Sequence, residues 1–401
     1  MKVRSPSTRS VGVAPADGEA LSEELPAWLE ALAPQVVVAT YWLDPGVKGK
    51  SFSARVRFTG RRCGVVGRLQ PEDRFDRTET VLGIVPGSGP VAITTTAIVP
   101  APGDWLVSAE PSTGGGDRRL RPARRVSPLP DGRPTHRASA VQALRFWGTP
   151  SMAAPLPGTI AARRKSLVAP PGSLIGSWPV LVLIGVILGL LVQWQLILRS
   201  GLRPWSVAGL TIAAAVAGYL GAKAWFLVLE RRITAATLTE GLCIQGFIVG
   251  AALVLLAGVL VLHLPPGTVA DDTAPALFFG IAVGRLGCFL TGCCAGRPTA
   301  SRWGIWSSDR RIGARRVPTQ LWEAFLGLAL GLVTLLMVLR GAATIPGAIA
   351  LGSLAVYTLG RQALFGYRNE SRRSTLARPL VIAVAGLLLA GDVVSSMLAR
   401  A

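Results

Sequence analysis

Histidine, tyrosine and acidic residues are all scarce in this chain of 401 residues. There are 2 histidines, 4 tyrosines and 22 Asp or Glu against 42 Lys or Arg, so the formal net charge is +20. His136 falls in a stretch rich in Pro and Gly, which leaves His263 as the only imidazole available as a base in the apolar half of the chain. No internal repeat occurs at a fixed spacing, which excludes solenoid and propeller folds.

Charged residues are also nearly absent from seven long stretches that follow residue 178. A helix needs roughly 20 apolar residues to cross a hydrocarbon layer, and none of the stretches alternates with the period of a barrel strand. The stretches span 179–198, 205–229, 242–264, 274–294, 320–339, 343–364 and 379–398. The sequence therefore predicts an all-α polytopic membrane domain of seven transmembrane helices over residues 179–401.

The amino-terminal part has short β-branched runs in place of long apolar ones. Clusters of Gly, Pro and Asp separate these runs, which lie at 35–42, 51–59, 79–85, 90–97 and 104–109. The pattern predicts a small soluble all-β domain over residues 1–111. Residues 112–178 are rich in Pro, Gly and Arg and have no apolar period, which predicts a flexible basic linker.

The excess of positive charge is spread over both halves of the chain. Anionic phospholipid is a better partner for it than nucleic acid, because basic segments beside membrane spans gain about 1 kcal/mol per charge near such lipids. Basic loops precede the first helix and follow the fourth and sixth, and the first 30 residues lack the apolar core of a signal peptide. By the positive-inside rule, these features predict a cytoplasmic amino terminus.

Two arginines interrupt the apolar stretches, Arg285 in the fourth and Arg361 in the sixth. A guanidinium inside a membrane costs at least about 2.5–3.5 kcal/mol, so an anion or water must meet it there. Tyr357 lies four residues before Arg361, on the same helix face. Arginine suits phosphate because its donors contact two oxygens together. The alternative is a structural ion pair, for which the helices offer Glu323 and Asp392.

Three cysteines follow Arg285 closely in the chain: Cys288, Cys293 and Cys294. They can be small apolar packing residues. A thiol beside guanidiniums has a lowered pKa, so the same residues can also supply thiol chemistry as a nucleophile or redox group. Metal ligation together with Cys243 is a third possibility, but the spacing matches no standard metal site.

A set of short motifs surrounds these arginines. The motifs are Gly284-Arg285, Gly292, Gly296-Arg297, the run PTQLWEA from Pro318 to Ala324, the run GAKAWF from Gly221 to Phe226, Gly246 with Gly250, and Tyr357 with Arg361 and Arg368. Together with the seven helices, they resemble the signature of bacterial prolipoprotein diacylglyceryl transferases. The chain looks like a divergent, cysteine-containing member of that family. The resemblance covers residues 172–370 and does not reach the β domain.

The resemblance implies a multi-pass transferase of the bacterial inner (plasma) membrane. Such an enzyme moves the diacylglyceryl group of phosphatidylglycerol to a cysteine thiol in the lipobox of a prolipoprotein signal peptide, during lipoprotein biosynthesis. No cofactor, metal or nucleic acid is implied. The matching positions imply catalytic roles for Arg285, Tyr357 and Arg361, and substrate contacts for Gly296, Arg297, Gln245 and Arg368.

The chain departs from the family pattern at several polar positions. Cys288 and Cys293 stand where most members have an asparagine and a glutamate, Gln245 where they have a histidine, and Phe365 where they have an acid. Three hypotheses therefore stay open. The chain is a diacylglyceryl transferase, a catalytically inactive paralogue that binds anionic phospholipid, or a thiol-based membrane redox or metal protein.

Overall fold

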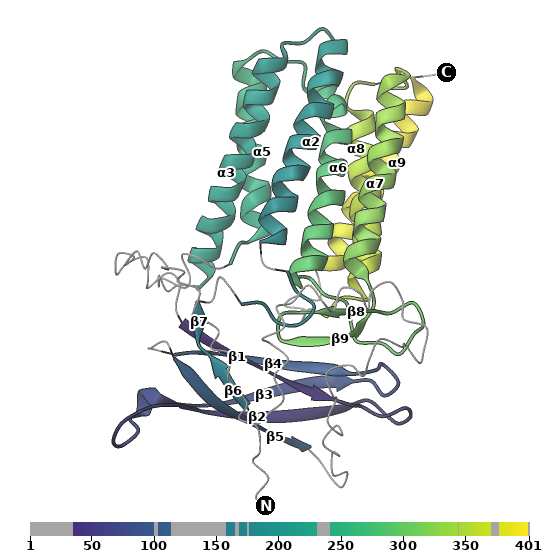
Figure 1. The fold of residues 1–401 in the computed structure, drawn as a ribbon. Coiled ribbons are helices and arrows are strands. Elements are labelled where there is room, and N and C mark those ends of the chain that lie inside the picture. The colour runs from purple at the N-terminus through teal and green to yellow at the C-terminus, as the bar shows by residue number, and fades with distance from the viewer. Residues whose placement is uncertain are drawn as a thin grey trace, which may run out of the picture.

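The structure is a computed structural model that describes residues 35–99, 103–113, 158–164, 168–174, 176–230, 241–343, 345–369 and 377–399. Most of the predicted linker, including His136, lies outside these residues. Within them, long helices form a bundle, and β-sheets lie at one end of it (Figure 1).

Seven helices among the described residues are long and apolar enough to cross a membrane. They are α2 (Ser177–Arg199), α3 (Pro204–Glu230), α5 (Ile244–Val261), α6 (Pro266–Thr291), α7 (Thr319–Leu339), α8 (Ala348–Phe365) and α9 (Ala377–Leu398). Glycines allow close helix packing, since a Cβ on Gly246 of α5 would lie 2.2 Å from the carbonyl oxygen of Gly221 in α3. The predicted seven-helix architecture is confirmed.

Helix α6 begins earlier than predicted and includes two buried acids, Asp271 and Asp272. Both carboxylates have partners. Asp271 accepts hydrogen bonds from the backbone N–H of Gly347 (2.7 Å) and of Ala350 (2.8 Å), and so caps the start of α8. Asp272 accepts one from the Ser200 hydroxyl at 2.6 Å. A sequence search for apolar runs excludes these acids because it cannot see their partners.

The carboxyl-terminal end of α6 also differs from the predicted stretch 274–294. The helix stops at Gly292, which has a φ of 75° and forms a left-handed cap. A side chain there would not fit, because a Cβ would lie 2.7 Å from the carbonyl oxygen of Ser308. Cys293 and Cys294 therefore follow the helix, and their directions do not obey helical spacing.

Nine strands in the described residues form two antiparallel sheets, which confirms the predicted all-β region. They are β1 (Gln35–Leu43), β2 (Phe52–Arg62), β3 (Arg74–Ile84), β4 (Val91–Ile98), β5 (Asp104–Thr113), β6 (Gly158–Ala161), β7 (Arg163–Arg164), β8 (Ile305–Ser308) and β9 (Ile312–Arg316). The strand orders are β7-β1-β4-β9-β8 and β3-β2-β5-β6. Strands β1 to β5 lie at the five predicted runs. Strands β6 and β7 come from the segment that the sequence assigns to the linker.

The two sheets share one apolar core, which follows from the alternation of side chains along each strand. In β2, Val56 and Phe58 are fully buried, while Arg55 and Arg57, on either side of Val56, are exposed. Trp105 of β5 is also fully buried in this core. Burial of one such large apolar side chain contributes about 1.5–3 kcal/mol, so the sandwich has a core of its own.

The hairpin of β8 and β9 belongs to the loop between α6 and α7, yet it completes the amino-terminal sheet. Strand β9 pairs with β4, with Ala92 opposite Gly313 and Ile93 opposite Ile312. The sequence analysis predicts no strand in this loop, because its two strands are short and lie among arginines. One sheet is therefore shared by the amino-terminal region and the membrane domain.

Side-chain contacts strengthen this junction. The Trp306 ring in β8 stacks on Trp42 of β1, with centroids 5.9 Å apart, and its Nε1 donates a hydrogen bond to the Pro90 carbonyl at 3.0 Å. The guanidinium of Arg311 forms an ion pair with Glu79 at 2.5 Å. The division of the chain into residues 1–111, 112–178 and 179–401 stays a prediction.

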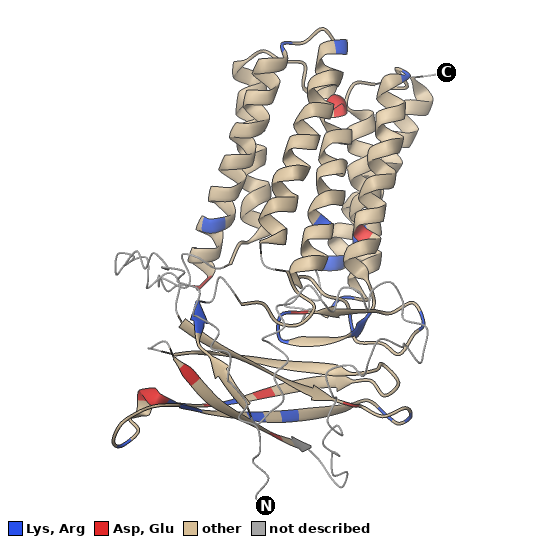
Figure 2. Ribbon diagram, in the orientation of Figure 1, with Lys and Arg blue, Asp and Glu red and all other residues tan. Residues whose placement is uncertain are grey.

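Charge is distributed unevenly along the long axis of the molecule. Figure 2 shows few charged positions along the helices and many on the sheets and at the bundle end beside them. The carboxyl-terminal end of α6 and the amino-terminal end of α7 both lie at this sheet-facing end, and the β8–β9 hairpin connects them.

Candidate functional site

A buried ionic triad lies at the sheet-facing end of the bundle. The Glu323 carboxylate of α7 forms an ion pair with Arg285 Nε of α6 at 2.6 Å and a second one with Arg368 Nη1 at 3.4 Å. The Glu323 and Arg368 side chains are 2% and 3% exposed, whereas that of Arg285 is 13% exposed. Arg285 is thus the member of the triad that a ligand can reach most easily.

Two guanidiniums share one carboxylate in the triad. Breaking a buried pair by removing one partner typically costs about 3–5 kcal/mol, so Glu323 stabilises both arginines in place. The structural ion pair, one of the two alternatives for Arg285, is present in this arrangement. The anion site stays a prediction.

The loop that follows α6 is held against the chain beyond α8. Gly296 forms an isolated β-bridge with Arg368, and a Cβ on Gly296 would lie 2.0 Å from the Val317 carbonyl oxygen. Arg297 donates its backbone N–H to the Tyr367 carbonyl (2.8 Å) and its side-chain Nε to the Arg368 carbonyl (3.1 Å). Glycine is required at 296 because two backbone segments pass it closely.

Arg316 of β9 links this loop to the shared sheet. Its guanidinium is 1% exposed and donates hydrogen bonds to the Gly296 carbonyl at 3.0 Å and to the Asp309 carboxylate at 2.6 Å. Burial lowers the pKa of Arg316, while the charge of Asp309 opposes that change. The amino-terminal sheet and the loop of Gly296 are therefore connected through one buried arginine.

The three predicted cysteines gather beside the triad. The thiols of Cys288, Cys293 and Cys294 interact with one another, and Cys293 also donates to the Cys288 carbonyl, with a sulfur–oxygen distance of 3.6 Å. Hydrogen bonds from the other two thiols and the positive charges of Arg368 and Arg285 hold the pKa of Cys294 well below its ordinary range, despite its partial burial. The same thiol contacts raise the pKa of Cys293.

Metal ligation by the cysteines finds no support in the described part of the chain. No group of three or more His, Cys, Asp or Glu there has the geometry to hold a metal ion. Cys243 lies apart from the other three and donates instead to the Gln245 side-chain oxygen, at 2.7 Å.

Tyr357 of α8 lies next to the triad on the apolar side. Its ring packs against Phe278 of α6 with centroids 5.8 Å apart, and the residue is 8% exposed. Its hydroxyl is close enough to interact electrostatically with the Arg285 guanidinium. The structure therefore brings Tyr357 near Arg285, while the catalytic roles of both stay predictions.

Arg361 and Gln245 are not drawn into this network. Arg361 is half-buried and has no hydrogen bond or ion pair with the residues that the structure describes. Gln245 is exposed at the start of α5, where its side chain contacts Cys243. The catalytic role of Arg361 and the substrate contact of Gln245 stay predictions.

Sequence reasoning missed Glu323 and Arg316 as members of the site. The sequence suggests Glu323 only as a possible ion-pair partner, although an acid in an apolar helix is itself a signal of function. Arg316 gives no such signal, because it is one of several arginines in a polar loop. Only its burial in the structure distinguishes it.

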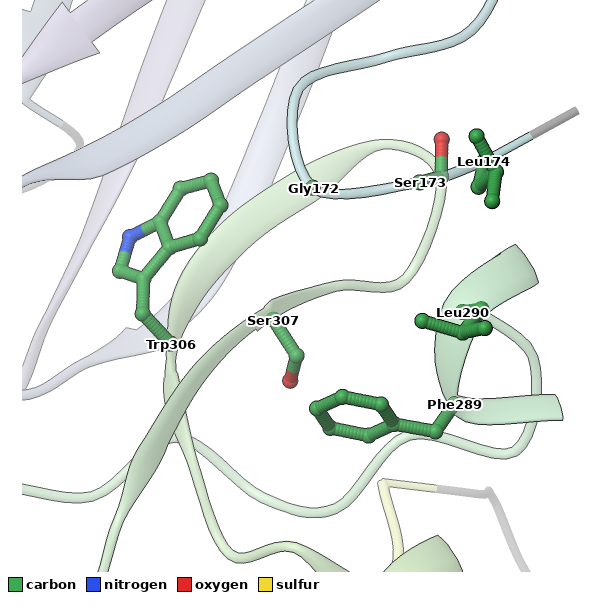
Figure 3. Close-up of a pocket in the computed structure, with 7 residues that line it drawn as sticks. All are labelled: Gly172, Ser173, Leu174, Phe289, Leu290, Trp306 and Ser307. Carbon is green, nitrogen blue, oxygen red and sulfur yellow. The ribbon is translucent and has the colours of Figure 1, made fainter. Parts of the chain in front are cut away.

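A small pocket lies beside the end of α6. Figure 3 shows that it is lined by Gly172, Ser173, Leu174, Phe289, Leu290, Trp306 and Ser307. The Gly172 backbone, with a φ of 77°, lies against the Trp306 ring, where a Cβ would come within 2.5 Å. None of the predicted site residues lines this pocket.

A comparison with known families decides where this site belongs. The model of the family "Prolipoprotein diacylglyceryl transferase" matches residues 169–399, which include the triad, Tyr357 and the cysteines. The chain belongs to this family. The matched range leaves out β1 to β7 but includes β8 and β9, so the diacylglyceryl transferase part of the chain supplies two strands of the sheet.

Individual relatives in the transferase family are distant. A phosphatidylglycerol–prolipoprotein diacylglyceryl transferase from Nostoc sp. is 27% identical over 209 residues, which cover 48% of this chain and 74% of the relative. A second enzyme of this name, from Clostridium perfringens, is 27% identical over 213 residues, which cover 51% of this chain and 82% of the relative. An enzyme of the same name from Dehalococcoides mccartyi is 36% identical over 95 residues, which cover 23% of this chain and 36% of the relative.

Proposed function

We propose that this chain transfers the diacylglyceryl group of phosphatidylglycerol to the thiol of a lipobox cysteine in a prolipoprotein. The observation that carries the proposal is Arg285, a partly exposed guanidinium in a buried ionic triad with Glu323 and Arg368. The names of the relatives supply the two substrates. As a multi-pass protein, the chain would act in the bacterial plasma membrane.

The reaction is a displacement at the terminal glyceryl carbon that carries the phosphate. The acceptor thiolate forms a carbon–sulfur bond, the carbon–oxygen bond to phosphate breaks, and glycerol phosphate leaves with the electron pair. Negative charge builds up on the phosphate, so fixed positive groups stabilise the transition state more than the ground state. Arg285 and Arg361 would contact the phosphate, and the Tyr357 hydroxyl would orient it.

The loop after α6 would bind the polar part of the lipid. Gly296 keeps the backbone open, and Arg297, Gln245 and Arg368 would supply further donors to the head group. Arg368 is buried behind Arg285, so it would act on the phosphate mainly through its charge. The acyl chains would remain between the helices, in contact with the bilayer.

The test is transfer to a synthetic lipobox peptide by the purified full chain in phosphatidylglycerol vesicles. We expect a thioether product with the added mass of diacylglycerol. Arg285→Ala should lower the rate at least 10²-fold, the usual effect of removing one donor to a developing negative charge. Arg302→Ala is the matched control, because that arginine is exposed in the next loop and stacks on Trp303. Absence of product in vesicles of varied composition would contradict the proposal.

A lipid-binding protein without transferase activity is the second candidate. It is favoured by Gln245 and Phe365, which stand at positions where the resemblance leads one to expect a histidine and an acid. In that case phosphatidylglycerol would bind to the wild type and not to Arg285→Ala, while neither protein would form a thioether.

A further inference from the structure

Cys294 has a backbone conformation that a residue with a side chain rarely adopts. Its φ is 56°, and among the described residues other than glycine only His263 and Arg310 also have a positive φ. Such conformations persist where the surroundings enforce them, and they are concentrated at functional sites. Cys294 is half-buried, whereas Cys288 is buried, so a substrate can reach Cys294.

The groups around Cys294 come from several elements. Arg285 and Cys288 are in α6, whereas Cys293 and Arg368 lie in the segments that follow α6 and α8. Two of the four are cations and two are thiols, and the Glu323 carboxylate of α7 is bound to both cations. This environment favours a negative charge on the Cys294 sulfur.

Neither Glu323 nor His263 is well placed to act as the base. Glu323 is committed to two arginines, so it is a poor proton acceptor. His263 follows the end of α5, at the far end of the helices from the sheets. The transfer reaction nevertheless needs a group that deprotonates the acceptor thiol.

We propose that Cys294, as a thiolate, takes the proton from the acceptor thiol during diacylglyceryl transfer. This inference rests on the proposed function. The guanidiniums keep the Cys294 sulfur deprotonated in the empty site, so its proton affinity there is below that of the acceptor thiol. Binding of the lipid phosphate to the guanidiniums adds negative charge beside Cys294 and makes its sulfur more basic when the base is needed.

The proton and the electrons balance in this scheme. The acceptor proton moves to Cys294 Sγ, and the acceptor sulfur then forms the bond to the glyceryl carbon. The carbon–oxygen bond breaks and its electron pair leaves on the phosphate oxygen. Cys294 gives its proton to that oxygen, which restores the thiolate, so no oxidant or reductant is consumed.

The experiment compares kcat and KM for phosphatidylglycerol between the wild type, Cys294→Ala and Cys294→Asp. We expect a 10²- to 10⁴-fold lower kcat in Cys294→Ala, the usual contribution of a general base, with KM little changed. A carboxylate in Cys294→Asp should restore part of the rate. Cys63→Ser is the matched control, since that cysteine is exposed on the sandwich.

The dependence of the rate on pH separates a base from a structural residue. Activity should fall as the pH drops through the pKa of Cys294 and the thiolate is protonated. In Cys293→Ala, the thiolate loses a hydrogen-bond donor that stabilises it, so this acidic limb should move to higher pH. In the wild type, the acidic limb of the pH profile should lie at higher pH for kcat than for kcat/KM. The reason is that kcat reports the enzyme–lipid complex, in which the bound phosphate makes the Cys294 sulfur more basic, whereas kcat/KM reports the free enzyme.

Two results would overturn the inference and leave the proposed function intact. One is thioether formation by Cys294→Ala at the wild-type rate with an unchanged pH profile. The other is alkylation of Cys294 by iodoacetamide at pH 6 no faster than that of Cys63, measured in the wild type and so independent of any folding defect. If the wild type forms no thioether at all, the proposed function fails, and the role of Cys294 as its base fails with it.

Discussion

Glu323 determines the charge of the whole site at the residue scale. It is 1% exposed and is shared by two guanidiniums. A carboxylate in this position holds the two cations close together. The two ion pairs therefore compensate the burial of both guanidiniums.

Removal of the Glu323 carboxylate should destabilise the folded protein. We expect Glu323→Ala to lower its stability by about 3–5 kcal/mol, because two buried guanidiniums lose their counter-ion. Thermal unfolding in detergent measures this effect. Glu323→Gln keeps the volume and is the control for packing, and it should also be destabilised. An unchanged unfolding temperature in both variants would mean that the triad contributes nothing to folding.

Residues differ in how far sequence reasoning can place them. Arg285 is recognisable because a charge among apolar residues is costly wherever the helix packs. The meeting of Cys294 with Arg285 and Arg368 is not recognisable, because it depends on a left-handed turn after Gly292 that reverses the chain. If α6 continued through Cys294, helical spacing would place this residue on the side away from Arg285. The helix ends before Cys294, so that spacing does not apply.

At the scale of elements, the β8–β9 hairpin joins two parts of the chain that the sequence suggests are independent. It pairs with β4 on one side, and its Arg316 holds the Gly296 loop on the other. Displacement of the sandwich would therefore disturb the loop at the ionic triad. The appended region is a structural support of the site as well as an addition to it.

Loss of the Trp306 side chain should loosen this junction. We expect Trp306→Ala to destabilise the docked sandwich by about 1–3 kcal/mol, since the ring loses its stacking on Trp42 and its hydrogen bond to Pro90. Limited proteolysis of the β1–β5 region should become faster. Trp303→Ala is the control, because Trp303 is 70% exposed in the same loop. Equal proteolysis rates in the two variants would contradict the contact.

At the scale of the whole molecule, the sandwich and the candidate site share one side of the membrane. One sheet contains β1, β4 and β7 from the sandwich together with β8 and β9 from the loop between α6 and α7. A bilayer therefore cannot separate the sandwich from that loop. The positive-inside rule predicts that this is the cytoplasmic side. The structure fixes only that the two parts lie together.

Labelling by a membrane-impermeant maleimide tests this arrangement. We expect Cys63 and a cysteine introduced by Arg302→Cys to react from the same side of sealed cells, and one introduced by Arg340→Cys to react from the other. Arg340 follows α7, which begins at the sheets and ends at the far side of the bundle. Labelling of all three sites from one side would contradict a spanning α7.

The class of the protein follows from local features of the sequence. Seven apolar stretches and five β-branched runs have free-energy consequences that do not depend on the rest of the fold. They sufficed to predict the membrane helices and the all-β region.

Only the tertiary structure decided how these parts meet. The pairing of β4 with β9, the sharing of Glu323 by Arg285 and Arg368, and the gathering of three thiols all join residues from different elements. Such contacts form because the folded chain brings buried polar groups to one another, where each compensates the desolvation of its partner. No local pattern in the sequence predicts which buried polar groups become partners.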